Sequence, residues 1–158
     1  MTTLLLKAND IPTLTAMSGN IDADSLKPHI YTAQSVNLKR ILGETLYNKI
    51  LTDYETDALA GEYLIIYNNY IVDLLTYISC GYYMTFGGYK TANQGIYKTT
   101  AEGGQLVDYK EVTYLITQYK ELAANIESNF YKYIKTISIP EYTNDTNDYN
   151  TNKVIPWY

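Results

Sequence analysis

Apolar residues recur along most of this chain at spacings of three and four, the pattern of one face of an α-helix. The pattern predicts four helices, over residues 26–42, 44–54, 62–84 and 108–138. Asp22, Asp24 and Ser25 are suited to begin the first of them, and Gly43 to end it. Residues 1–20 contain turn formers and predict an irregular lead-in. The predicted fold class is therefore all-α.

The third predicted helix is the most hydrophobic, because its apolar residues cover most of its circumference. The helical period is kept by Leu64, Tyr67, Ile71, Leu74, Leu75, Ile78 and Tyr82, and the apolar surface is widened by Ile65, Ile66, Val72 and Tyr77. Such a helix belongs at the centre of a bundle or between subunits. The fourth helix has one apolar face, formed by Val112, Leu115, Ile116, Tyr119, Leu122, Ala123, Ile126, Phe130, Tyr133, Ile134 and Ile137.

Residues 87–106, between the third and fourth helices, do not continue a helical pattern. They contain Gly87, Gly88, Gly95, Gly103 and Gly104, and glycine disfavours helix interiors. We expect either a long Gly-rich loop or a short β-hairpin arm formed by Tyr89, Ile96 and Tyr97. A connection of this length is uncommon in a compact domain unless it has a function, so we treat it as an interaction arm.

The last helix is interrupted at Ile139-Pro140, and a polar stretch then leads to the apolar run Val154–Tyr158. That run contains the only tryptophan of the chain, Trp157. Tryptophan and tyrosine anchor interfaces, because each buries a large area for few rotatable bonds. We therefore divide the chain into one helical domain, residues 1–138, and an extended docking tail, residues 139–158. The expected tail contacts are Tyr142, Tyr149, Ile155, Trp157 and Tyr158. The alternative is that Trp157 folds back onto its own bundle.

Composition narrows the classes of partner. The net charge of −5 and the pI near 4.8 disfavour a protein that binds nucleic acid by neutralising phosphates, but they suit a surface that DNA passes without sticking. The chain has 19 Tyr and 2 Phe, which is typical of contact surfaces or, equally, of ordinary core tyrosines encoded by an AT-rich gene. The single cysteine, Cys80, predicts a reducing compartment, and no apolar stretch is long enough to span a membrane. We expect a soluble protein made in a cytoplasm.

The residues with catalytic potential are isolated. His29 is the only histidine and has no serine or cysteine at a recognisable spacing, so a surface or capping role is favoured. Cys80 lies in an apolar stretch without a basic neighbour and is expected in the core. We expect Glu62, Asp73, Glu121 and Glu127 to lie on solvated helix faces. An enzyme with a shallow site would be indicated only if changing His29 alone abolished an activity.

Two segments can be compared with known ion-binding and phosphate-binding motifs, and neither matches. Residues 20–31 resemble the start of a calcium loop, but Ser25 stands where that loop requires glycine and Tyr31 where it requires glutamate. The Gly-rich stretch lacks the GxxxxGK[ST] pattern of phosphate-binding loops. We therefore predict no enzymatic activity, no cofactor and no metal.

Three segments carry a family resemblance. Residues 26–50 contain Leu26-Lys27-Pro28-His29-Ile30, then Ile41-Leu42-Gly43 and Leu46-Tyr47. Further on come Asn93-Gln94-Gly95-Ile96 and, closing the last helix, Ile139-Pro140-Glu141-Tyr142. In their order and spacing these motifs resemble head–tail connector proteins of tailed bacteriophages, most closely the neck ring proteins of crAss-like phages that infect Bacteroidetes. The resemblance covers residues 21–142 and leaves residues 143–158 without a counterpart.

The resemblance implies a connector-type four-helix bundle that forms a ring, typically of about twelve copies, below the portal protein. Such a ring extends the DNA channel and joins the capsid to the tail, with the long loop and the tail contacting neighbouring copies, the portal and further neck or tail proteins. The implied protein is a structural virion component at the head–tail junction, made in the host bacterial cytoplasm. The competing hypothesis is a non-virion assembly factor or interaction adaptor with the same bundle.

Overall fold

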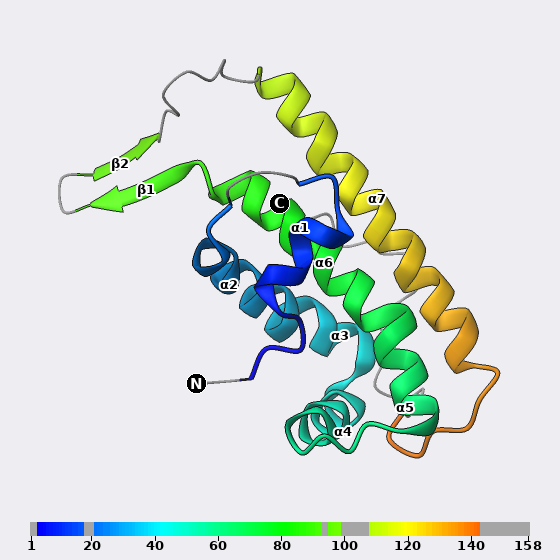
Figure 1. Cartoon of the computed structure of the whole chain (residues 1–158). Coiled ribbons are helices and arrows are strands. Elements are labelled where there is room, and N and C mark those ends of the chain that lie inside the picture. The colour runs from blue at the N-terminus through cyan, green and yellow to red at the C-terminus, as the bar shows by residue number, and fades with distance from the viewer. Residues whose placement is uncertain (1–2, 18–20, 93–94, 99–107, 143–158) are drawn as a thin grey trace.

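The computed structural model describes residues 3–17, 21–92, 95–98 and 108–142, and it confirms the all-α fold class (Figure 1). Two short helical turns, η1 (Ala8–Asp10) and α1 (Ile11–Leu14), precede the main helices. The main helices are α2 (Ala23–Thr32), α3 (Lys39–Leu42), α4 (Glu44–Glu55), α5 (Gly61–Ile66), α6 (Val72–Phe86) and α7 (Tyr109–Ile134). Two strands, β1 (Tyr89–Ala92) and β2 (Gly95–Lys98), separate α6 from α7.

The first predicted helix is one continuous run, α2–η2–α3, in which η2 (Ala33–Leu38) is a π-helical segment. The Asp22 side chain caps the run by accepting a hydrogen bond of 3.0 Å from the backbone N–H of Asp24. The run ends at Gly43, whose φ of 76° lies in the region that glycine alone adopts easily. The sequence signals at both ends are therefore confirmed.

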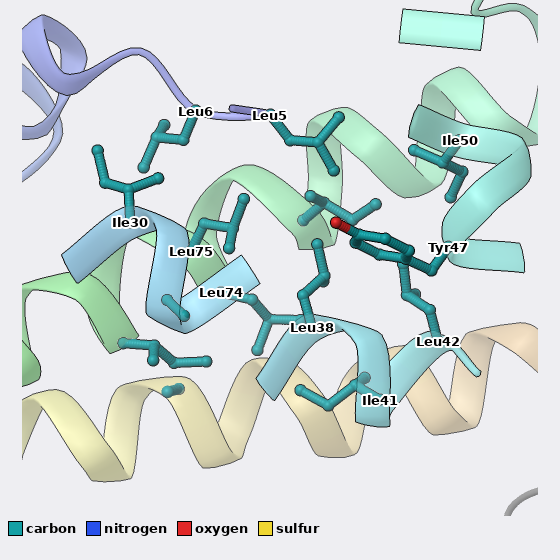
Figure 2. Close-up of a cluster of buried hydrophobic side chains, with 14 of the residues drawn as sticks. Leu5, Leu6, Ile30, Leu38, Ile41, Leu42, Tyr47, Ile50, Leu74 and Leu75 are labelled. Atoms are coloured by element: carbon teal, nitrogen blue, oxygen red, sulfur yellow. The ribbon is translucent and has the colours of Figure 1, made fainter. Parts of the chain in front are cut away.

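The third predicted helix is the run α5–η3–α6, interrupted by the π-helical segment η3 (Tyr67–Ile71). α6 packs against both α2 and α7 and lies at the centre of the molecule (Figure 1). Leu74, Leu75 and Cys80 of this helix are completely buried. Its apolar circumference is thus explained by its central place in the fold. Figure 2 shows Leu74 and Leu75 beside Ile30, Leu38 and Ile41 of the first helical run.

The irregular lead-in predicted for residues 1–20 is wrong for residues 8–14, which form η1 and α1. Leu5, Leu6 and Ile11 of this segment are core residues with 0–2% of their surface exposed. Figure 2 shows Leu5 and Leu6 in the core. The Leu5 N–H donates to Oε1 of Gln34 over 2.8 Å, and the Leu5 carbonyl accepts from the Tyr67 hydroxyl over 2.8 Å. Side chains from distant helices thus replace the backbone partners that an extended segment lacks.

Candidate assembly interface

The predicted interaction arm contains an antiparallel β-hairpin. Tyr89 pairs with Lys98 at its base, and Ala92 pairs with Gly95 next to its turn. The hairpin follows α6 and extends away from the helical body (Figure 1). Tyr89 opens β1, and Gly95, Ile96 and Tyr97 all lie in β2. Gly103 and Gly104 lie outside the described residues. A hairpin this short is marginal as an isolated unit.

Gly87 links α6 to the hairpin at a point of close backbone approach. Its N–H donates to the Tyr83 carbonyl over 2.6 Å. A Cβ built at Gly87 would lie 2.6 Å from that carbonyl oxygen and 2.9 Å from the Tyr83 ring. Glycine is therefore required here for lack of space. Gly88 is different, because a Cβ there would meet no heavy atom within 4 Å.

Aromatic side chains anchor the base of the arm to the first helical run. Phe86 is 55% exposed and stacks on Tyr82, with ring centroids 6.3 Å apart. The Tyr82 hydroxyl donates to Oδ1 of buried Asn37 over 3.1 Å. His29 meets the Tyr83 ring edge-on at 5.7 Å, and partial burial lowers the pKa of its imidazole. The histidine thus packs against α6 near the base of the arm, and the exposed Phe86 is the last residue of that helix.

A partly uncovered surface lies where α6 meets α7. The rings of Tyr77 on α6 and Tyr119 on α7 lie 6.3 Å apart. Leu115 and Leu122 lie one turn before and one turn after Tyr119, and each is 43% exposed. Asp73 lies one turn before Tyr77. We call Asp73, Tyr77, Leu115, Tyr119 and Leu122 the seam face. The sequence placed both leucines with the core-facing residues of the helix, and their exposure shows that the fold leaves this flank of α7 incompletely covered.

Asp73 is the charged group of the seam face. Its side chain is half-buried, and burial raises the pKa of its carboxyl group. No hydrogen bond or ion pair to Asp73 is found among the residues that the structure describes. The solvated position predicted for it is therefore only partly right: the carboxyl group is partly desolvated, and no cation pairs with it among the described residues.

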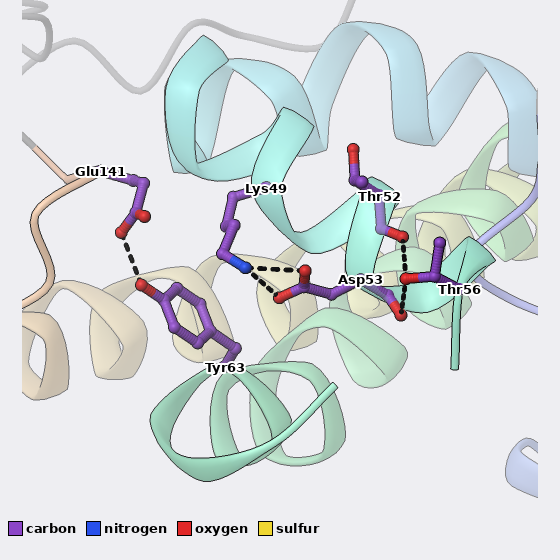
Figure 3. A network of polar contacts seen from close by, with 6 residues as sticks. All are labelled: Lys49, Thr52, Asp53, Thr56, Tyr63 and Glu141. Carbon is purple, nitrogen blue, oxygen red and sulfur yellow. Dashed lines mark hydrogen bonds and ion pairs between the residues drawn. The ribbon is translucent and has the colours of Figure 1, made fainter. Parts of the chain in front are cut away.

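The first residues of the predicted docking tail pack on their own molecule. α7 ends at Ile134, and residues 135–142, which we call the C-terminal strap, cross to α5 at the end of the bundle (Figure 1). The Tyr63 hydroxyl donates to Oε2 of Glu141 over 2.6 Å (Figure 3). Ile139 is 8% exposed, and the Tyr142 ring meets the edge of Phe130 at 6.1 Å. The tail assignment is thus corrected for residues 139–142, and Tyr142 contacts its own helix α7. Tyr149, Ile155, Trp157 and Tyr158 lie outside the described residues.

A polar network supports the strap from α4. Nζ of Lys49 pairs with both carboxylate oxygens of Asp53 at 2.7 Å and lies 5.2 Å from the centroid of the Tyr63 ring (Figure 3). The Glu141 carboxylate, together with burial of the ring, raises the pKa of the Tyr63 hydroxyl to about 12. The hydroxyl is therefore held in its protonated, donating form.

The structure confirms the predicted position of Cys80 but not that of Glu127. Cys80 is completely buried, as predicted, and burial raises the pKa of its thiol to about 12. Glu127 is not solvated: its oxygens pair with both terminal nitrogens of Arg40 at 3.1 Å. This fork joins α3 to α7, and sequence reasoning missed it because the partners are 87 residues apart. Glu62 and Glu121 are exposed, as predicted.

Sequence reasoning also missed Gln34, which the structure makes the main polar contact of the N-terminal segment. Its Nε2 donates to the Thr3 carbonyl at 2.9 Å and to the Tyr47 hydroxyl at 3.1 Å. The only available signal was a polar residue at a position where the helical period calls for an apolar one. Within the described part of the chain, no group of three or more His, Cys, Asp or Glu is placed to hold a metal, and no helix is long and apolar enough to cross a membrane.

Comparison with known proteins identifies one family. Residues 38–152 match DUF6712, described as a family of unknown function. No curated protein and no solved structure matches the chain.

Proposed function

We propose that this chain, which belongs to the DUF6712 family of unknown function, is a structural virion protein of a tailed bacteriophage. In this proposal it is a head–tail connector that forms a homo-oligomeric ring below the portal, extends the DNA channel and joins capsid to tail. One observation supports it most: a hairpin arm extends from the helical body, which itself leaves the seam face incompletely covered.

A closed ring of identical copies needs two different surfaces on each copy. A head-to-tail contact uses one patch of the first copy and another patch of the next, and the ring closes when the rotation between copies returns to its start. The arm and the seam face are two such patches. The resemblance to connector proteins described above sets the expected copy number at about twelve.

The charge of the chain also fits the role. A net charge of −5 gives no attraction for the phosphate backbone of DNA. A channel wall with this property lets DNA pass without retaining it. In the proposal, the contacts with the portal and with further neck or tail proteins are left to the tail beyond the strap, whose aromatic end is suited to docking.

The proposal is tested by replacing the arm in the phage. The change substitutes residues 89–98 with a Gly/Ser sequence of equal length, and Lys132→Ser, an exposed position on α7, is the control. We expect DNA packaging to begin and tail joining to fail for the arm replacement only, as counted by electron microscopy of the particles. Tailed, infectious particles at the wild-type frequency would contradict the proposal.

The alternative function, a non-virion assembly factor or adaptor, makes a different prediction. Such a protein would act during morphogenesis and be missing from finished particles. Arm replacement would then lower the yield of particles, while the particles that do form would have normal necks.

A further inference from the structure

We propose that the hairpin arm of one copy docks on the seam face of the next copy, where a lysine of the arm pairs with Asp73. This inference rests on the proposed ring and adds to it the two surfaces in contact and the ion pair between them. The occupant of the seam face is thus residues 89–98 of a second copy.

Charge complementarity is the first reason. The arm contains Lys90 and Lys98 and no acidic residue, although the whole chain has a net charge of −5. Asp73 is half-buried without a cation among the described residues. Partial desolvation of a carboxylate is costly unless the group is paired, and a lysine brought by a neighbour would supply a partner.

Apolar surface is the second reason. Leu115 and Leu122 stay 43% exposed on either side of Tyr119. In the hairpin register Tyr89 pairs with Lys98, and Thr91 pairs with Ile96. Tyr89, Ile96 and Lys98 therefore share one face of the arm and can take part in the same contact, whereas Tyr97 lies on the opposite face. An interface with an aromatic and aliphatic centre and a charge pair at its edge has the usual composition of a specific protein contact.

The shape of the arm is the third reason. In Figure 1 the hairpin leaves the end of α6 and extends away from the helical body, so it can reach a neighbouring copy. A contact between the arm of one copy and a different surface of the next is heterologous and can repeat head to tail.

Disulfide trapping tests the contact directly. Full-length protein with Ile96→Cys is mixed with full-length protein with Leu122→Cys, and the disulfide between positions 96 and 122 is quantified by mass spectrometry after mild oxidation. Native Cys80 does not interfere, because it is completely buried. The control mixes Ile96→Cys with Lys132→Cys, an exposed position on the same helix. We expect about tenfold more trapping at position 122 than at position 132 across a range of protein concentrations.

Charge exchange tests the ion pair. Asp73→Asn keeps the size of the side chain, and Asp73→Lys reverses its charge; each is expected to reduce trapping about tenfold. When the seam-face copy carries Asp73→Lys, exchanging both lysines of the arm copy for aspartate should restore trapping. Circular dichroism checks that each variant is folded. Equal trapping at positions 122 and 132, or trapping unaffected by Asp73→Asn, would overturn the inference. After either result, detection of this chain in the necks of finished particles would still support the proposed function.

Discussion

Close contacts at single residues fix two segments that the helical pattern alone does not explain. Gly87 allows the chain to leave α6 toward the hairpin, because only a hydrogen fits against the Tyr83 carbonyl. Gln34 holds the N-terminal segment by binding the backbone of Thr3 and Leu5. Each contact predicts the effect of one substitution.

Gly87→Ala should destabilise the protein by about 1–3 kcal/mol, the usual cost of forcing an extra carbon into a filled space. The new Cβ would lie 2.6 Å from a backbone oxygen that cannot rotate away. Gly88→Ala is the matched control, because its Cβ would meet nothing within 4 Å, and it should change stability by less than about 0.5 kcal/mol. Urea unfolding followed by circular dichroism measures both. Equal free energies of unfolding for the two variants would show that the close approach does not exist.

Gln34→Ala should cost about 2–3 kcal/mol, because it leaves the buried Leu5 N–H without a partner and removes the bond to the Thr3 carbonyl. The loss should appear first as faster amide hydrogen exchange at Leu5 and Leu6. Ser35→Ala removes a neighbouring hydroxyl that bonds only within its own helix, so it should leave both quantities nearly unchanged. Unchanged exchange at Leu5 in Gln34→Ala would contradict the assigned contact.

At the scale of helices and strands, the sequence predicts the elements whose apolar residues recur with a regular period. The second helix was expected over residues 44–54 and is Glu44–Glu55, because its apolar face is complete within its own residues. The segment Leu5–Leu6 is too short to show a period, and its main partner lies 29 residues away, so its burial could not be read from the sequence. The glycines marked the arm, but the seam face depends on how much of α7 its neighbours cover, which is a property of the tertiary structure.

The strap that follows α7 should loosen at high pH. The pKa of Tyr63 is about 12 in the folded protein, above the ordinary value of 10.0, so the folded state retains the proton longer than the unfolded chain does. Its contribution to stability is therefore complete below pH 10 and is lost as the pH rises from about 10 toward 12. Other tyrosines, such as Tyr133, share this direction.

The difference between wild type and Tyr63→Phe isolates the contribution of the strap. We expect the free energy of unfolding of Tyr63→Phe to fall less steeply than that of wild type between pH 9 and about 11, since the variant has no hydroxyl at this position to ionise. Tyr31→Phe, which changes an exposed tyrosine, is the control. Parallel curves for wild type and Tyr63→Phe would show that the Glu141 contact contributes nothing to stability.

At the scale of the whole molecule, the proposed function depends on association between copies. In the helical body, α6 lies at the centre and packs against α2 and α7. The arm leaves that body, and the seam face is the part of its surface that retains an unpaired, half-buried carboxylate among the described residues. These features have a simple explanation if neighbouring copies meet through them in a ring.

Counting this chain against the portal protein in purified phage particles tests the central claim most directly. Quantitative mass spectrometry of the particles should give a ratio near one, which corresponds to about twelve copies in a ring that matches the portal. Absence of the chain from mature, DNA-filled particles would contradict the connector function and favour an assembly factor instead.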